Sequence, residues 1–208
     1  MSKDSLVMGV AGVFFGVLVG WIIGTQQQGR PAAPAAATAA SSQASGAGAN
    51  AQAPPPLDES RASAMKTTAQ QNPADAVTRV QLGNLYFDAG RFQDAVEWYQ
   101  AALKIHPKDV DVSTDLGISY YYMNQPDQAL AQFDRSLGID PGHAKTLLNI
   151  GIVRAFGKQD LKGAAEVWQR VLVVAPSSEE ARAAKQALDG LRSAHPDLGI
   201  AAPKGQGS

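Results

Sequence analysis

The chain contains no cysteine and only three histidines among its 208 residues. The lack of cysteine excludes disulfides, thiolate catalysis, thiolate metal sites and a lipid anchor on an N-terminal cysteine. The histidines, His106, His143 and His195, lack the short spacing by which two histidines on one helix face bind a metal. Nucleophile-elbow and phosphate-loop motifs are missing as well. We therefore expect no enzyme, no metal and no cofactor.

Charge is also scarce and nearly balanced. The net charge is −1 and the pI is near 6.3, which gives no electrostatic case for a nucleic-acid partner. Residues 6–24, LVMGVAGVFFGVLVGWIIG, carry no charge at all. As a helix they would span roughly 28 Å, close to the ~30 Å hydrocarbon thickness of a bilayer. They predict a transmembrane helix. The alternative is a cleaved signal peptide, whose apolar part usually runs about 7–15 residues.

The flanks of this helix give its orientation. The N-terminal flank, residues 1–5, carries Lys3 offset by Asp4, while the far side offers only Arg30. We expect the N-terminus in the cytoplasm and the remainder outside. For a bacterial protein, this means a single-pass protein of the inner membrane with its main domain in the periplasm.

Within residues 6–24, glycines recur every four residues and would line one helix face. Such a face predicts helix–helix packing in the membrane, although glycine is also common in transmembrane helices generally. The glycines are Gly12, Gly16, Gly20 and Gly24.

Residues 25–57 contain no core-forming segment. They are mostly Ala, Pro, Gly, Ser and Gln with a single charge, a composition typical of a disordered linker. A flexible chain of this length spans roughly 30 Å, so we expect a tether that holds a domain near the bilayer.

Three later segments, residues 82–107, 116–141 and 150–176, align with one another. Their glycines Gly83 and Gly117, like the glycine of the third segment, are 34 residues apart. Each copy reads as two helices separated by a turn, and the third holds one extra residue in that turn. The predicted fold is all-α and built of helical repeats. We place its copies at residues 76–109, 110–143 and 144–178, between a flanking helix at 58–75 and a capping helix at 179–195, with a disordered tail at 196–208.

The pattern resembles the tetratricopeptide repeat, a helix–turn–helix unit of 34 residues. The resemblance implies an all-α, right-handed α-solenoid. The usual early tryptophan is absent, and the third copy departs at Arg154 and Val171, where an aromatic and an alanine are usual. The matching positions are Leu82, Gly83, Tyr86, Ala95, Tyr99, Ala102 and Pro107; Leu116, Gly117, Tyr120, Ala129, Phe133 and Pro141; and Gly151, Ala164, Trp168 and Pro176. Ser177 and Glu180 form a capping-box pattern at the start of the capping helix.

The resemblance implies a concave groove lined by the first helix of each copy. Tyr120 aligns with the core residue Tyr86, whereas its two neighbours are expected to face the groove. Exposed aromatic clusters usually mark an interaction site, unless the flanking helices or a second copy cover them. The expected groove residues are Val80, Asn84, Phe87, Asp88, Thr114, Ile118, Tyr121, Tyr122, Lys145, Leu148, Ile152 and Phe156.

Some members of the family bind acidic peptide tails through a clamp of Lys, Asn, Asn, Lys and Arg. Only two of the five aligned positions match this clamp, and Asp115 would repel a carboxylate. The sequence therefore disfavours an acidic tail as the ligand. The aligned positions hold Val80, Asn84, Asp115, Lys145 and Asn149. The groove instead favours an apolar, extended or helical peptide.

The resemblance implies a scaffold or adaptor. Membrane-tethered members take part in cytochrome c maturation, secretion and pilus assembly, so we expect this chain to bind a protein or peptide partner in assembly of an envelope complex. The alternative is a homo-oligomeric structural protein joined through the glycine face and solenoid contacts.

Overall fold

The computed structural model describes residues 53–200. The predicted transmembrane helix with its four glycines, the N-terminal flank, nearly all of the predicted linker and the end of the tail lie outside these residues. The chain divides into two compact units, residues 1–53 and 54–208, and every described helix belongs to the second. No helix within residues 53–200 combines the length and the apolar character needed to cross a membrane.

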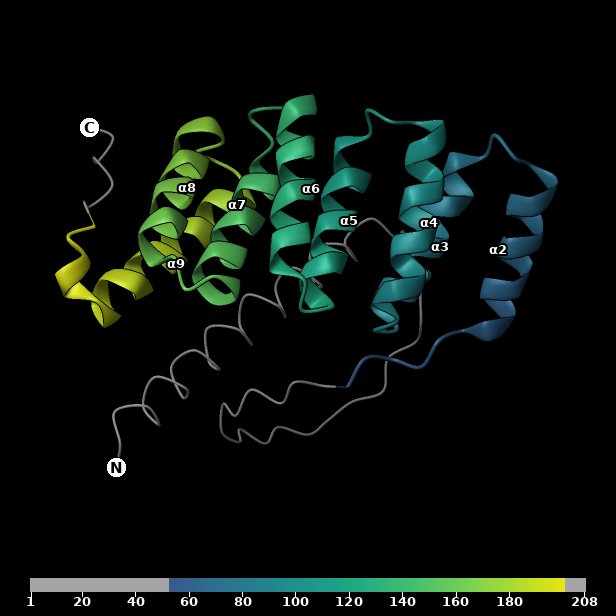
Figure 1. Cartoon of the computed structure of the whole chain (residues 1–208), viewed down its shortest axis with the longest axis horizontal. Coiled ribbons are helices and arrows are strands. Elements are labelled where there is room, and N and C mark those ends of the chain that lie inside the picture. The colour runs from purple at the N-terminus through teal and green to yellow at the C-terminus, as the bar shows by residue number, and fades with distance from the viewer. Residues whose placement is uncertain (1–52, 201–208) are drawn as a thin grey trace, which may run out of the picture. The chain divides into compact units, whose positions relative to one another are not determined.

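The described residues form eight α-helices and no strand, which confirms the all-helical fold (Figure 1). A π-helix, η1, extends the sixth of them, and a short 3-10 helix, η2, follows the last. The α-helices are α2 (Glu59–Gln71), α3 (Ala76–Asp88), α4 (Phe92–Ile105), α5 (Val110–Tyr122), α6 (Pro126–Ile139), α7 (Ala144–Ile152), α8 (Leu161–Val174) and α9 (Glu179–Ala194), with η1 at Val153–Gly157 and η2 at Pro196–Leu198.

Side-chain caps start several of these helices. The carboxylates of Asp75, Asp109 and Asp160 each accept a hydrogen bond from the backbone N–H three residues later, at α3, α5 and α8. At α9 the cap is Ser178, whose hydroxyl accepts from the N–H of Ala181 at 3.0 Å. The predicted capping box therefore starts one residue too early: Ser178 has the extended backbone of an N-cap, while Ser177 lies in the preceding turn.

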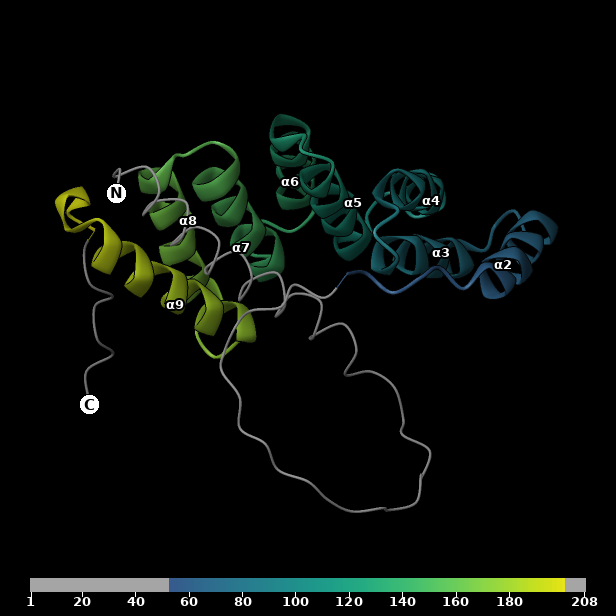
Figure 2. The same cartoon turned by 90° about the horizontal axis from the view of Figure 1, so that it is seen from below.

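The helices pair as the repeats predict. α3 packs on α4, α5 on α6 and α7 on α8, and each pair contacts the next. The row begins with α2 and ends with α9, which lies against both α7 and α8 (Figure 2). A solenoid needs such end helices, because each repeat buries its apolar face only against neighbours.

In each repeat, one glycine of the first helix packs against an aromatic ring of the second helix. An added Cβ at Gly83 would lie 2.4 Å from the Tyr99 ring, at Gly117 2.4 Å from the Phe133 ring, and at Gly151 2.1 Å from Trp168. No side chain fits in that space, so the ring of the second helix packs directly on the backbone of the first. The spacing of 34 residues is therefore a packing requirement that repeats along the chain.

We expect the Gly117→Ala substitution to lower the free energy of unfolding by about 1–2 kcal/mol, because the new methyl group overpacks the fully buried ring of Phe133. Urea unfolding of the full-length protein measures this loss. Gly138→Ala in α6 is the matched control: nothing lies within 4 Å of its added Cβ, so alanine should stabilise by about 0.5 kcal/mol. Equal effects of the two substitutions would contradict this packing.

The third repeat absorbs its extra residue as η1. Lys158 N–H donates to the carbonyl of Val153, five residues earlier, at 3.0 Å. All three turns contain one residue of positive φ, Gly90, Asn124 or Gln159, but in the first two repeats it follows the C-cap of a regular α-helix. The single insertion thus widens one helical turn and leaves the pairing of α7 with α8 intact.

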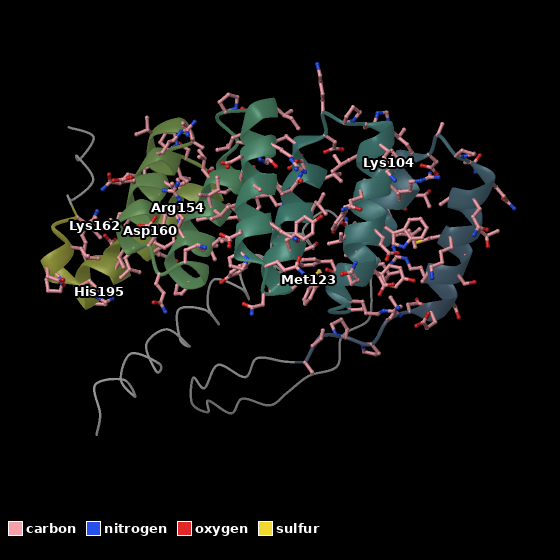
Figure 3. The ribbon with its side chains drawn as sticks, viewed as in Figure 1. Lys104, Met123, Arg154, Asp160, Lys162 and His195 are labelled. Carbon is pink, nitrogen blue, oxygen red and sulfur yellow. The ribbon has the colours of Figure 1, made fainter. Side chains whose placement is uncertain are left out.

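Arg154, the polar residue at a usually aromatic position, contacts the start of α8. Its Nη1 donates to the Gly163 carbonyl at 3.4 Å and lies 4.0 Å from the Asp160 carboxylate. Figure 3 shows Arg154 beside Asp160 at the start of α8. The departure from the family pattern therefore places an ion pair where an aromatic residue would pack.

Candidate functional site

The predicted groove residues lie on α3, α5 and α7 and on η1, one set from each repeat. The structure divides them by exposure. The exposed or partly exposed ones are mainly polar or aromatic: Val80, Asn84, Asp88, Tyr121, Tyr122, Lys145 and Phe156. The buried ones are mainly apolar: Phe87, Thr114, Ile118, Leu148 and Ile152. The accessible part of this surface is therefore more polar than the sequence list suggests.

An ion pair joins the second repeat to the third. The Lys145 ammonium on α7 donates to Oδ1 of Asp115 on α5 at 2.6 Å. The side chain of Asp115 is only 12% exposed, against 25% for Lys145. Burial raises the pKa of Asp115, and the ammonium of Lys145 opposes that rise by stabilising the charged carboxylate. The charge of Lys145 is thus already matched within the chain.

A second contact joins the helices of the first repeat. The Tyr99 hydroxyl on α4 donates to Oδ1 of Asn84 on α3 at 2.8 Å. Burial raises the pKa of Tyr99 well above its usual value, and the negative charges of Asp115 and Asp88 add to the effect. The charges of Asp88 in the first repeat and Asp115 in the second therefore both act on Tyr99.

Asp88 is the last residue of α3. Desolvation raises its pKa, the positive charge of Arg61 opposes this, and the negative charge of Asp115 raises it further. Among residues 53–200, no cation lies within ion-pair distance of Asp88, and no group donates a hydrogen bond to it. Within the described part of the chain, the carboxylate of Asp88 therefore has no counter-charge in direct contact.

A chain of hydrogen bonds near the first turn of α7 is a feature that the sequence analysis missed. Thr114 Oγ1 lies 2.7 Å from Thr146 Oγ1, which in turn lies 2.7 Å from Nδ1 of His143. Nε2 of His143 is 3.3 Å from the Asp111 carboxylate, and this bond lowers the pKa of Asp111. Thr114, a predicted groove residue, therefore bridges α5 and α7 from a buried position. No local signal in the sequence pairs Thr114 with Thr146, because Thr146 belongs to the next repeat.

The three consecutive tyrosines point to three different neighbours. The Tyr120 hydroxyl accepts a hydrogen bond from Nε2 of Gln100 at 2.9 Å. Tyr120 is partly exposed, although it aligns with the buried Tyr86. The Tyr122 ring stacks on Phe92 of the first repeat, with centroids 4.8 Å apart. Tyr121 lies against the third repeat, 3.4 Å from the position of a Cβ at Gly157.

These tyrosines therefore join the repeats at the end of α5, which Met123 marks in Figure 3. Partial burial raises the pKa of Tyr121 and of Tyr122 to about 12, so both hydroxyls stay protonated near neutral pH. Both tyrosines keep part of their surface exposed, and their place in a partner-binding groove stays a prediction.

No group of three His, Cys, Asp or Glu side chains within residues 53–200 is arranged to hold a metal ion. The clusters at the groove are ion pairs and hydrogen bonds between helices. Their chemistry suits recognition of polar and charged side chains.

Two family models match this chain. A model described as TPR repeat matches residues 83–124, and one described as tetratricopeptide repeat matches residues 114–197. Among curated proteins, the BBSome complex member BBS4 of Bos taurus is 29% identical over 100 residues, which are 48% of this chain and 19% of BBS4. The peroxisomal targeting signal receptor of Candida glabrata is 27% identical over 81 residues, 39% of this chain and 14% of the receptor. The chain thus spans less than a quarter of either relative.

Solved structures share the fold at low sequence identity. The crystal structure of MamA aligns with a TM-score of 0.55 at 18% identity, covering 66% of this chain and 81% of MamA. The first TPR of Spaghetti (RPAP3), bound to the HSP90 peptide SRMEEVD, aligns with a TM-score of 0.53 at 22% identity, covering 60% of this chain and 98% of that domain.

Proposed function

Because residues 83–197 are built of tetratricopeptide repeats, we propose that this chain is a scaffold that binds a protein or peptide partner in its concave groove. Domains of this type are typical protein–protein interaction scaffolds, and the family is generally non-catalytic. One neighbour, the Spaghetti (RPAP3) domain, was solved with a peptide bound. An extended segment of a partner is therefore the kind of ligand that we assign to this chain.

One observation carries the proposal. Side chains from three successive repeats, Val80, Tyr121 and Lys145 among them, keep exposed surface on helices of the solenoid. Ion pairs and aromatic contacts between the repeats fix these helices relative to one another. A surface that is held rigid and keeps polar and aromatic groups accessible binds with little loss of conformational entropy.

We further propose that residues 6–24 anchor the scaffold in a bacterial inner membrane, with the repeats in the periplasm. The uncharged run of these residues supports the anchor, and the composition of residues 25–57 supports a tether. A tethered scaffold raises the local concentration of its partner at the membrane, as assembly of an envelope complex requires.

The test is site-specific photocrosslinking in the full-length protein within its own cells. A photoreactive amino acid replaces Val80, which is partly exposed on α3, and, as a control, Glu97, which is exposed on α4. We expect one heterologous protein to form adducts from position 80 and about tenfold less from position 97, since only the first lies in the groove.

Adding Asn84→Arg, which fills the groove with a long charged side chain, should abolish the adduct at position 80. Equal adducts from both positions would overturn the groove as the binding site. Adducts formed only with a second copy of this chain would favour the alternative function, a homo-oligomeric structural protein.

A further inference from the structure

We infer that the groove between the first two repeats receives a basic side chain, lysine or arginine, of the partner and rejects acidic peptides. This inference rests on the proposed function and specifies the ligand of the same site. The observation behind it is a pair of acidic side chains, Asp88 and Asp115, of which only the second has a cation in contact.

The positions aligned with the acid-binding clamp offer little positive charge to an acidic tail, because their charged groups pair within the chain. The only cation among them is Lys145, and its ammonium is bound to Asp115 at 2.6 Å. Asn149 uses its Nδ2 to donate to the backbone carbonyl of Lys145 at 2.8 Å. An incoming carboxylate would have to separate Lys145 from Asp115 and leave a nearly buried carboxylate without a counter-charge.

The remaining hydrogen-bonding capacity consists of acceptors. Among the described residues, Oδ2 of Asp115 and both carboxylate oxygens of Asp88 accept no hydrogen bond. Oδ1 of Asn84 already accepts from Tyr99. Free carboxylate acceptors call for a donor, and ammonium and guanidinium groups are the side-chain groups that carry several donors and a positive charge.

The charge balance points the same way. Lys145 matches the charge of Asp115, whereas no cation of residues 53–200 lies in contact with Asp88. Arg61 of α2 acts on Asp88 only from beyond ion-pair distance. The carboxylate of Asp88 therefore attracts an ammonium or guanidinium group of a partner and repels a carboxylate.

Flanking surface fits the stem of such a residue. The partly exposed Val80 lies on the same helix as Asn84 and Asp88, at positions spaced by four residues. Lysine and arginine pack their methylene groups along apolar surface while the charged end reaches a carboxylate. We therefore place the basic residue of the partner along α3, with its charged end at Asp88.

The test is selection of a random twelve-residue peptide library on the immobilised full-length protein. Selected peptides should be enriched in lysine and arginine over aspartate and glutamate. Their affinity, measured by fluorescence anisotropy, should fall about tenfold in Asp88→Asn, which keeps the shape of the side chain and removes its charge. The matched control is Asp134→Asn, an exposed charge on α6, which should change affinity by less than about twofold.

The outcomes separate this inference from the proposed function. Selected peptides without a basic residue, whose binding is blocked by Asn84→Arg but unchanged by Asp88→Asn, would overturn the inference and leave the groove as a binding site. Failure to enrich any peptide would overturn both. Binding of the acidic peptide SRMEEVD as tightly as the selected basic peptides would also overturn the inference.

Discussion

Trp168→Ala is expected to lower the free energy of unfolding by about 3–5 kcal/mol, the largest single effect that we predict. The side chain is 2% exposed and packs directly on the backbone of Gly151. Its indole N–H donates to the carbonyl of Leu148 at 3.1 Å. Truncation would leave a cavity between α7 and α8 that no neighbouring side chain fills. Urea unfolding followed by circular dichroism measures the loss.

The matched control is Trp98→Ala in α4, which removes the same volume from a partly exposed site. We expect it to cost less than about half as much, because water already reaches part of the ring. Trp168→Phe keeps most of the packing and loses the hydrogen bond, so its cost should be about 1 kcal/mol. Equal losses for the two tryptophan-to-alanine variants would mean that Trp168 is not the centre of the third repeat.

The fold is predictable from the sequence because its main packing rule is local and repeated. Gly83, Gly117 and Gly151 each accept one ring from the second helix of the same repeat, and the glycine and ring positions recur together along the chain. Even the extra residue of the third repeat is visible as an insertion. What the sequence did not indicate is the form it takes, since a π-helical turn and a longer loop both absorb one residue.

The site is less predictable, because its contacts join residues from different repeats. Alignment assigns Tyr121 and Tyr122 to a face, but the partner of each ring depends on how neighbouring repeats stack. Tyr122 therefore reaches Phe92, and Tyr121 reaches Gly157, without any pattern in the sequence that pairs them.

The charged residues of the site are partly readable from the sequence. Asp115 departs from the acid-binding clamp in the sequence itself, and the structure adds that it holds Lys145. The sequence could not show that Asp88 lacks a counter-charge in contact, because that depends on side-chain distances across α2, α3 and α5.

The Asp115–Lys145 pair should respond very differently to loss of its two members. Lys145→Met is expected to lower the free energy of unfolding by about 3 kcal/mol near neutral pH, because it leaves the nearly buried carboxylate of Asp115 without its cation. Asp115→Asn should cost less than about 1 kcal/mol, because the more exposed ammonium of Lys145 can turn toward water. Thermal unfolding of the two full-length variants compares these costs.

The pH dependence of the free energy of unfolding of Lys145→Met identifies the cause of its lost stability. Burial and the negative charges of Asp111 and Asp109 raise the pKa of Asp115, and without Lys145 nothing in direct contact opposes that rise. A carboxyl whose pKa is higher in the folded state than in the unfolded chain binds its proton more tightly when folded. The deficit of this variant is therefore full above the raised pKa and shrinks as the pH falls toward the ordinary value of 3.8. A deficit that stays constant from neutral to mildly acid pH would assign the loss to packing of the lysine stem.

The same pair of variants connects stability with recognition. Asp115→Asn frees the ammonium of Lys145 and removes one of the two acidic groups, so the groove should lose its preference for basic peptides while the fold is retained. Adding Val80→Lys places a second cation on α3 and should make the variant bind SRMEEVD about tenfold more tightly than the wild-type chain does. We expect Asp115 to prevent this binding in the natural chain. An acidic ligand gained by two substitutions would therefore show that charge, on an unchanged scaffold, selects the partner. Unchanged binding in the double variant would mean that the groove selects its ligand by shape.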